Sequence, residues 1–357
     1  MLLGSAFRSP LVGLDIGSSA LKAVVLRRGR SGWSLVAAGE APLPEGSMEA
    51  GTTSDPTAVS EAASGLFDTL KLRRARVATA LSGHAVIVKR LALPSMSQAE
   101  LSDAIPWEAE QYIPFDLSEV QLDYQVVTGG GKADASKSSL DVLLVAAKRD
   151  RIDDRAAVIA QTGRRPVVVD IEAFALANAY QMNYPERSDA LSALVHVGQR
   201  LTIVCLLEHG EPVFTRDISI GGQLHHDAVT RELGARGIDD LAARRILHGQ
   251  FPADVNPDQV ASVLRHASEQ LVMEVRNTID FYRATAPVEK LSRIVVSGGA
   301  YQAVGLVDLL ASEFGAPVDV FDPFRRVARP NRAIGAEATG PSYAVAVGLA
   351  MRQEGDR

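Results

Sequence analysis

Hydrophobic residues recur along this chain in short runs that are separated by glycine-containing turns. The first example, residues 11–26, is an aliphatic run, a Gly-Ser-Ser turn and a second aliphatic run, which is typical of a β-hairpin. Residues 193–207 repeat this pattern near the middle of the chain. A third glycine turn, residues 298–300, follows an apolar run and precedes a segment that we expect to be helical. The sequence therefore predicts two halves that open with similar hairpins.

Capping residues mark where two of the helices begin. An Asp-Pro pair at residues 55–56 indicates a helix start, because Asp caps a helix N-terminus and Pro suits the first helical position. Ser97 and Glu100 have the spacing of a capping box and open a predicted helix over residues 98–112. Pro106 lies inside that segment, so we expect it to kink or restart the helix.

A long helix is predicted over residues 257–285. Apolar residues recur there every three or four positions, which is the pattern of a helix that buries one face. The expected buried face consists of Val260, Leu264, Ala267, Leu271, Val275, Ile279 and Tyr282.

The order of these elements predicts an α/β protein with an insertion in its first half. Residues 85–165 are expected to form an inserted strand–helix–strand–strand–helix unit, after which the host domain resumes. We expect two domains, residues 1–188 and 189–357. Their expected subdomains are 1A (1–84 and 166–188), the insertion 1C (85–165), 2A (189–230 and 291–341), 2B (231–290) and a C-terminal helix (342–352).

Composition and charge limit the class of protein. The 357 residues are 46% hydrophobic and 22% charged, which is ordinary for a globular protein of about two domains. A net charge of −6 argues against a nucleic-acid scaffold. The only cysteine is Cys205, so no disulfide can form within the chain, and a reducing compartment fits. No run has the roughly eighteen uncharged apolar residues of a membrane span. We therefore expect a cytoplasmic protein that reaches the membrane only through a partner.

The first hairpin carries candidate phosphate-binding chemistry. Backbone N–H groups of the turn Gly17-Ser18-Ser19 can point at one anion, and its small side chains let a phosphate approach closely. Asp15, just before the turn, could hold a magnesium ion through water, and Lys22 adds a point charge for phosphate. The alternative on this stretch alone is an ordinary hairpin.

The three glycine turns, in this order, resemble those of the actin-like ATPase fold. The resemblance implies two duplicated α/β domains around a nucleotide cleft, with a small inserted α+β subdomain in the first domain. The two hairpins would be the phosphate loops, the third turn would contact adenosine, and ATP or ADP with Mg²⁺ would be the cofactor. Residues 170–180 resemble the first connecting helix of that fold, and residues 342–351, with Gly348, resemble the second.

The sequence of the insertion resembles that of one family within this fold. Residues 105–127, IPWEAEQYIPFDLSEVQLDYQVV, closely resemble a signature of the PilM family of type IV pilus assembly proteins, as do residues 214–222 and 274–282. The resemblance covers nearly the whole chain. It implies a cytoplasmic scaffold for pilus assembly and twitching motility, which binds the N-terminal tail of a PilN-like inner-membrane protein and links it to the pilus ATPases. Whether the protein self-associates, and whether the machine is a pilus, competence or gliding system, stays open.

The resemblance implies which residues of this chain form the nucleotide-binding, catalytic and partner-binding sites. The nucleotide-binding set is Asp15, Gly17, Ser18, Ser19, Lys22, Gly198, Gln199, Arg200, Gly298, Gly299, Ala300 and Gly348. Glu172 takes the position of an acidic residue near the attacking water, which makes it the catalytic candidate. The partner-binding set is Tyr112, Ile113, Pro114 and Phe115, which should receive an extended peptide. Trp107, Tyr112 and Phe115 could line the partner groove or belong to the insertion's own core, and for Trp107 we expect the core.

The second phosphate loop departs from the fold's pattern. His196 stands where the fold has Asp, and a neutral imidazole is a poor magnesium ligand. The alternative for His196 is a hydrogen-bonded core histidine. Arg200 could still face a phosphate, but residues 241–249 carry Arg and His where related chains carry Glu and Lys. We therefore hypothesise that nucleotide binding is weak or vestigial and that hydrolysis is slow or absent.

Two other functions compete with the scaffold. The first is an active actin-like ATPase or small-molecule kinase, against which the second loop lacks its carboxylate. The second is a division protein that resembles FtsA, which carries an amphipathic C-terminal membrane helix. Residues 352–357, RQEGDR, are too polar and too few for such a helix.

Overall fold

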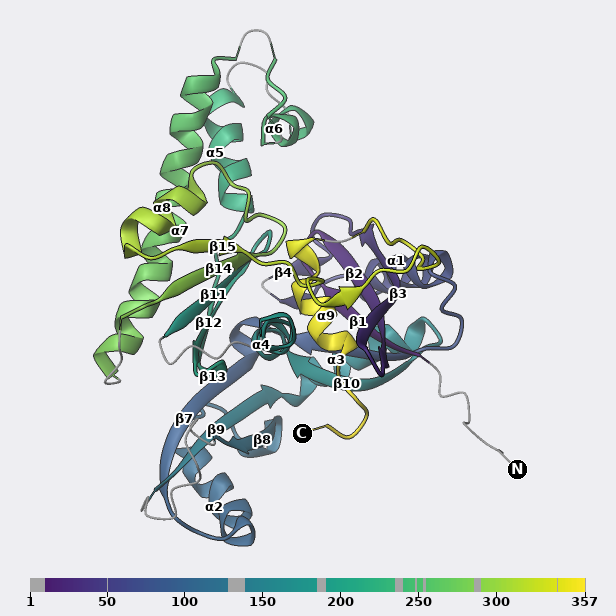
Figure 1. Cartoon of the computed structure of the whole chain (residues 1–357), viewed down its shortest axis with the longest axis vertical. Helices are drawn as coiled ribbons and strands as arrows, with labels where there is room; N and C mark the ends of the chain where they lie inside the picture. The colour runs from purple at the N-terminus through teal and green to yellow at the C-terminus, as the bar shows by residue number, and fades with distance from the viewer. Residues whose placement is uncertain are drawn as a thin grey trace. The chain divides into compact units, whose positions relative to one another are not determined.

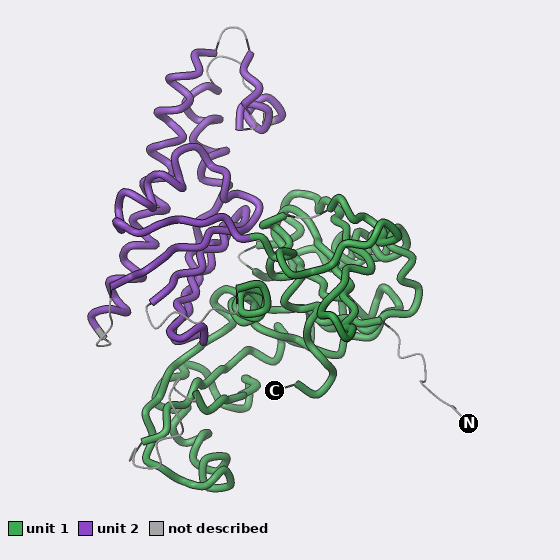
Figure 2. The backbone as a smooth tube through the Cα atoms, in the orientation of Figure 1, with its two compact units in different colours: residues 1–185, 322–357 green, residues 186–321 purple. Residues whose placement is uncertain are grey.

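The chain folds into two compact units (Figure 2). The computed structural model describes residues 10–49, 51–127, 139–184, 191–234, 240–247, 249–252, 255–285, 290–338 and 340–356. Unit 1 comprises residues 1–185 and 322–357, and unit 2 comprises residues 186–321. The C-terminal segment, residues 322–357, thus belongs to the first unit, whereas the sequence-based division had joined it to the second. The physical reason is packing, because this segment adds a strand and a helix to the sheet of unit 1.

Unit 1 is built on a six-stranded mixed sheet (Figure 1). Its strands, in spatial order, are β10 (Arg165–Ile171), β6 (Arg76–Leu81), β1 (Leu11–Ile16), β2 (Ala20–Gly29), β3 (Gly32–Pro42) and β16 (Val327–Ala328). The first hairpin is confirmed, since β1 and β2 pair antiparallel across the predicted turn. β1, β6 and β10 are parallel, so their carboxyl ends meet at one edge of the sheet.

Helices cover both faces of this sheet. The helices of unit 1's main body are α1 (Pro56–Thr69), α3 (Arg149–Gln161), α4 (Glu172–Asn183) and α9 (Ala344–Ala350). Residues of β6 show the two faces by their alternation: Val77 packs in the core under α1 and α3, whereas Ala78 packs in the core with α4 and α9. As predicted, Asp55 caps α1 by accepting from the N–H of Ala58 at 3.0 Å.

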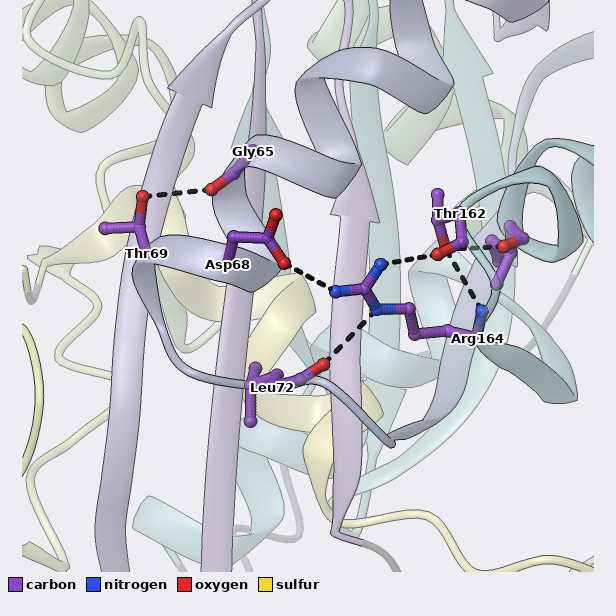
Figure 3. Close-up of polar contacts among 7 residues, drawn as sticks. Gly65, Asp68, Thr69, Leu72, Thr162 and Arg164 are labelled. Carbon is purple, nitrogen blue, oxygen red and sulfur yellow. Dashed lines mark hydrogen bonds and ion pairs between the residues drawn. The ribbon is translucent and has the colours of Figure 1, made fainter.

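Arg164 makes polar contacts with residues at the ends of both α1 and α3 (Figure 3). Its Nε donates to the Leu72 carbonyl at 3.2 Å, Nη2 pairs with Asp68 at 2.9 Å, and Nη1 donates to the Thr162 carbonyl. The guanidinium also lies over the ring of Phe67 at 5.1 Å. This arginine therefore links the end of α1, the loop before β6 and the end of α3 in one contact set.

The insertion forms its own small sheet with one helix. Its elements are β7 (Val86–Pro94), α2 (Gln98–Glu110), β8 (Val120–Val126) and β9 (Ser139–Lys148), with the strands in the antiparallel order β7-β9-β8. The capping box is confirmed, because Ser97 N–H donates to Glu100 at 2.8 Å and Ser97 Oγ accepts from Glu100 N–H at 3.3 Å. Pro106 lies inside α2, which continues past it to Glu110.

The last helix predicted for the insertion belongs to the host instead. That helix is α3, whose Val158 and Ile159 are buried in the core of the six-stranded sheet. The insertion's own core draws on α2 and the three strands. β9 runs directly into α3, so the chain passes from the insertion to the main sheet at Lys148.

Unit 2 repeats the strand order of unit 1. Its sheet has the order β13 (Glu211–Ile218), β12 (Thr202–Glu208), β11 (Ser192–Val197), β14 (Arg293–Ser297) and β15 (Val318–Val320). β11, β12 and β13 are antiparallel neighbours, and β11, β14 and β15 are parallel, which matches β1-β2-β3 and β1-β6-β10. The predicted duplication is therefore present in the topology of the two sheets.

The helices of unit 2 are arranged around its longest helix. They are α5 (Gln223–Leu233), α6 (Asp240–Leu247), α7 (Pro257–Thr285) and α8 (Leu306–Phe314). All seven residues of the predicted apolar face of α7 are buried. Leu271, Val275 and Ile279 pack against the sheet, whereas Val260 and Leu264 pack against α5 and α6. None of the helices in the described part of the chain combines the length and apolar character that crossing a membrane requires.

Candidate functional site

The first hairpin closes its turn with a single backbone hydrogen bond. Gly17 N–H donates to the Ala20 carbonyl at 3.2 Å, and a Cβ on Gly17 would lie 3.1 Å from that oxygen. Ser18 is half-buried and Ser19 is exposed. Lys22 stands opposite Asp15 in the β1–β2 register. The predicted phosphate-loop residues of unit 1 therefore lie on one short turn and the strand positions next to it.

The carboxyl ends of three parallel strands bring Asp15 and Glu172 to the same edge of the sheet. Asp15 is near the end of β1 and is only 7% exposed. Ser82 follows β6, and Glu172 is the first residue of α4, directly after β10. Ser82 Oγ donates to Glu172 Oε1 at 2.9 Å, which holds that carboxylate at the edge. The catalytic candidate and the first phosphate loop thus share one end of unit 1.

Arg155 of α3 is the member of this group that the sequence did not reveal. Its side chain is 2% exposed, and Nη2 donates to the carbonyl of Gly51 at 3.1 Å. Burial lowers the pKa of Arg155, and the charges of Glu172 and Asp15 oppose that shift. A signal was present in the sequence, because Arg155 falls between Ile152 and Ile159 on the apolar face of α3, where a charge is unexpected.

Burial and two nearby cations have opposite effects on the pKa of Asp15. Burial raises the pKa of Asp15, while Lys22 and Arg155 lower it. Gly51 stands between the two-residue strands β4 (Met48–Glu49) and β5 (Thr52–Thr53). It has φ +83°, and a Cβ there would lie 2.9 Å from the Ser82 carbonyl oxygen, so only glycine fits between Arg155 and Ser82 without strain. Asp15 and Arg155, which are buried, and Glu172, which is half-buried, therefore form one electrostatic group.

The donor set of this group does not fit a magnesium ion that the protein binds directly. Magnesium prefers several oxygen ligands, and the described residues contain no cluster of three or more His, Cys, Asp or Glu side chains that could hold a metal. The guanidinium of Arg155 also places a positive charge beside the carboxylate that would receive the ion. The water-mediated contact predicted for Asp15 stays a prediction.

The second hairpin has the same turn but is anchored to a helix. Gly198 N–H donates to the Leu201 carbonyl at 2.9 Å, as Gly17 does to Ala20. The carbonyls of Gly198 and Gln199 accept from the N–H groups of Gly222 and Gln223, at 2.9 and 2.7 Å. The second phosphate loop of the resemblance is thus fastened to the N-terminus of α5.

The third turn converges on the second within unit 2. Ala300 N–H donates to the Val197 carbonyl at 3.0 Å, and a Cβ on Gly222 would lie 2.6 Å from Cβ of Ala300. Gly298 has φ +94°, and a Cβ there would be 2.2 Å from the Val197 oxygen, so this position requires glycine. Gly299 is exposed and faces open space. The structure therefore brings the second and third turns together, and their contact with a nucleotide stays a prediction.

His196 has a hydrogen-bonded place in the core of unit 2. It is 8% exposed, and its Nδ1 lies 3.0 Å from Ser297 Oγ on the adjacent parallel strand β14. This geometry agrees with the interpretation of His196 as a core histidine. Arg200, in the same turn, is half-buried.

Gly348 has a packing role. It is buried in α9, and a Cβ at this position would lie 1.8 Å from the carbonyl oxygen of Ala175 in α4. A glycine is needed so that the two helices can approach this closely. Its predicted contact with a nucleotide stays untested by the geometry.

The partner-binding candidates differ in exposure. Tyr112 is 43% exposed and Pro114 is exposed, whereas Ile113 is buried in the insertion's core. Phe115 is half-buried, with Lys148 Nζ 4.1 Å from its ring centroid. The expectation that Trp107 belongs to the core is wrong, because this side chain is 73% exposed on α2. Tyr and Trp side chains are enriched at protein interfaces.

Comparison with known proteins places this geometry in a family. The chain matches the family described as type IV pilus assembly protein PilM over residues 13–354. It is similar to a chain of the solved PilM-PilN type IV pilus biogenesis complex, with 28% identity, a TM-score of 0.83, and coverage of 97% of this chain and 98% of that one.

More distant structures agree in fold alone. The ethanolamine utilization protein EutJ from Carboxydothermus hydrogenoformans is 16% identical, with a TM-score of 0.57 and coverage of 95% of this chain and 88% of that one. MreB5 of Spiroplasma citri bound to AMPPNP is 13% identical, with a TM-score of 0.52 and coverage of 95% and 94%. The chain has the actin-like ATPase fold, and it belongs to the family of the type IV pilus assembly protein PilM.

Proposed function

We propose that this protein is a cytoplasmic scaffold of type IV pilus assembly that binds the N-terminal tail of a PilN-like inner-membrane protein. The observation that carries the proposal is the match, over 97% of the chain, to a structure of a PilM-PilN complex. The insertion supports it from within this molecule, because it has its own core and still exposes Trp107 and Tyr112. We propose that the tail binds in extended form to the insertion, and that the complex connects to the pilus ATPases.

The experiment is a titration of the full chain with a peptide that comprises the cytoplasmic tail of its PilN-like partner. We expect binding by the wild-type chain and at least tenfold weaker binding by the double variant Trp107→Ala, Tyr112→Ala. Phe281→Ala is the matched control, since Phe281 is also a large exposed aromatic, 54% exposed, but lies on α7 of unit 2. Absence of binding by the wild type would refute the function, and unchanged binding by the double variant would refute this surface.

A flotation assay distinguishes the scaffold from a division-type protein. We expect the chain to float with lipid vesicles only when the vesicles carry the membrane partner with its tail intact. Flotation of the chain alone would favour direct membrane binding, as in a protein resembling FtsA.

We also propose that ATP or ADP binds weakly, through the turn Gly17-Ser18-Ser19, Asp15 and Lys22, and that hydrolysis is slow or absent. The support is chemical: where the second loop would need a carboxylate stands His196, whose Nδ1 lies 3.0 Å from Ser297 Oγ. Glu172, held by Ser82, is the residue that we propose would lie nearest to an attacking water. Calorimetric titration with ATP and Mg²⁺ tests the affinity, and a submicromolar dissociation constant would contradict it.

A further inference from the structure

The buried guanidinium of Arg155 is the feature that the scaffold function leaves unexplained. Nη2 donates to the Gly51 carbonyl at 3.1 Å, but Nη1 is fully buried and has no hydrogen-bond partner among the described residues. An arginine keeps its charge at any physiological pH, and a buried charge without compensation is strongly destabilising. The fold must therefore provide negative charge close to this group.

Two carboxylates provide that charge. Asp15 and Glu172 both act electrostatically on Arg155, and both stand at the carboxyl-end edge of the unit 1 sheet. Arg155 also lies close to Glu172 through neighbouring residues: its Nη2 donates to the Gly51 carbonyl, Gly51 leaves no room for a Cβ beside Ser82, and Ser82 donates to Glu172 at 2.9 Å. The guanidinium is thus built into the carboxylate site.

The formal charges of the two carboxylates and of the two cations that act on Asp15 balance without a metal. Asp15 and Glu172 carry two negative charges, and Arg155 and Lys22 carry two positive charges. Arg151 and Asp154, which line a small pocket with Arg155, belong to a separate set, in which Arg151 pairs with Asp154 at 3.8 Å and with Asp150 at 4.0 Å. An incoming phosphate at the turn of the first hairpin therefore meets a neutral group and the N–H groups of Ser18 and Ser19, without needing a divalent ion to cancel the two carboxylates.

We propose that Arg155 is a resident cation, which supplies beside Asp15 and Glu172 the positive charge that a magnesium ion would otherwise supply, so that the first phosphate loop binds nucleotide without metal. This inference rests on the proposed binding of a nucleotide. Arg155 acts through Asp15 and Glu172 and is a positioning residue, because its buried guanidinium does not itself reach solvent.

The test compares ATP binding in excess Mg²⁺ and in EDTA, by calorimetry, for the full chain and its variants. For the wild type we expect dissociation constants that agree within about threefold between the two conditions. For Arg155→Gln we expect binding in EDTA to weaken at least tenfold and Mg²⁺ to restore most of it. Arg155→Lys, which keeps the charge, should retain binding in EDTA.

Arg164→Gln is the matched control, since Arg164 is another arginine of unit 1 with little exposed side chain, but all three of its guanidinium nitrogens have partners (Figure 3). It should lower the melting temperature and leave the Mg²⁺-to-EDTA ratio unchanged. A wild type that loses binding more than tenfold in EDTA, or an Arg155→Gln variant with the wild-type ratio, would overturn the proposal.

A double-mutant cycle separates this inference from the nucleotide function. If the wild type binds no ATP in either condition, metal-free nucleotide binding is refuted, and the claim that Arg155 compensates Asp15 is decided by stability alone. We then expect Asp15→Asn and Arg155→Gln together to shift the urea midpoint less than the sum of their separate shifts. Additive shifts would show that the two groups do not compensate each other.

Discussion

The turns of the two hairpins close alike, with Gly17 N 3.2 Å from Ala20 O in unit 1 and Gly198 N 2.9 Å from Leu201 O in unit 2. The side chains before the turns differ. Asp15 of β1 lies in a buried group of charges with Arg155, whereas His196 of β11 pairs with a neutral serine. A shared topology therefore preserves the backbone of the hairpin turn without preserving the charge of the side chain before it, so the chemistry of each hairpin depends on its own neighbouring residues.

The two hairpins also differ in what lies beyond the turn. In unit 2, the carbonyls of Gly198 and Gln199 accept hydrogen bonds from the start of α5, so the turn is part of a fixed backbone network. In unit 1, the turn contributes the Ser19 carbonyl to Leu43 N–H at 2.9 Å, and the side chain of Ser19 is exposed. The turn of unit 2 is therefore held by more backbone hydrogen bonds from its neighbours than the turn of unit 1.

The largest expected effect is the loss of stability when a glycine in a close backbone contact is replaced, with one such glycine in each unit. Gly348→Ala should destabilise unit 1, and Gly298→Ala should destabilise unit 2, each by about 3 kcal/mol or more, because a Cβ would meet a backbone oxygen at 1.8 and 2.2 Å. Hydrogen exchange followed by peptide mass spectrometry shows which unit opens. Gly65→Ala is the control, since a Cβ there meets nothing within 4 Å. A loss below about 1 kcal/mol in either unit would contradict the packing described.

The second prediction uses pH to separate the units. Burial lowers the pKa of His225 in unit 2 to about 4, whereas a histidine in the unfolded chain titrates near 6.5. Between these values the unfolded state binds the proton and the folded state does not, so the free energy of unfolding falls as pH falls, by about 3 kcal/mol at most. Hydrogen exchange of unit 2 peptides between pH 7 and pH 4.5, corrected for the intrinsic rates, measures this loss.

Two buried carboxylates of unit 1 should contribute in the opposite direction. Burial raises the pKa of Asp15 and of Asp170, so the folded state holds these protons more tightly than the unfolded chain does, and this contribution favours folding as pH falls. His225→Gln should remove the pH dependence from unit 2 and leave that of unit 1 unchanged. If unit 2 showed the same stability at pH 4.5 and pH 7, the burial of an uncharged His225 would be excluded.

The smallest expected effect is the loss of stability when either of two serines, each hydrogen-bonded to a candidate site residue, is replaced. Ser82 donates to the carboxylate of Glu172, whereas Ser297 bonds to the imidazole of His196. Because hydrogen bonds to charged groups are stronger, Ser82→Ala should cost about 2 kcal/mol of the free energy of unfolding and Ser297→Ala about 1 kcal/mol. Urea titration measures both, and the reverse order would mean that Glu172 is not held by Ser82.

Local patterns in the sequence were sufficient for most of the fold. The capping box of Ser97 and Glu100 and the buried face of α7 depend only on spacing along one helix, and both are confirmed. The hairpins were predictable because a glycine turn between two aliphatic runs leaves few other structures.

Features that depend on distant residues could not be predicted in this way. The packing of α3 with the host, and of residues 322–357 with unit 1, is decided by which apolar faces meet. Trp107 was expected to be buried by residue type, but α2 turns Leu101, Ile105 and Ala109 to the core and leaves Trp107 exposed. Arg155 joins the site from a helix far along the chain from Asp15, and only the fold brings the two together.

The most direct test of the central claim is phosphate release from ATP by the full chain in Mg²⁺, measured with and without the partner's tail peptide. The account predicts that the tail binds while phosphate release stays at the level of the protein-free control in both samples. Brisk, sustained release that Asp15→Ala abolishes would contradict it, because the molecule would then be a working ATPase although its second hairpin has His196 in place of a carboxylate.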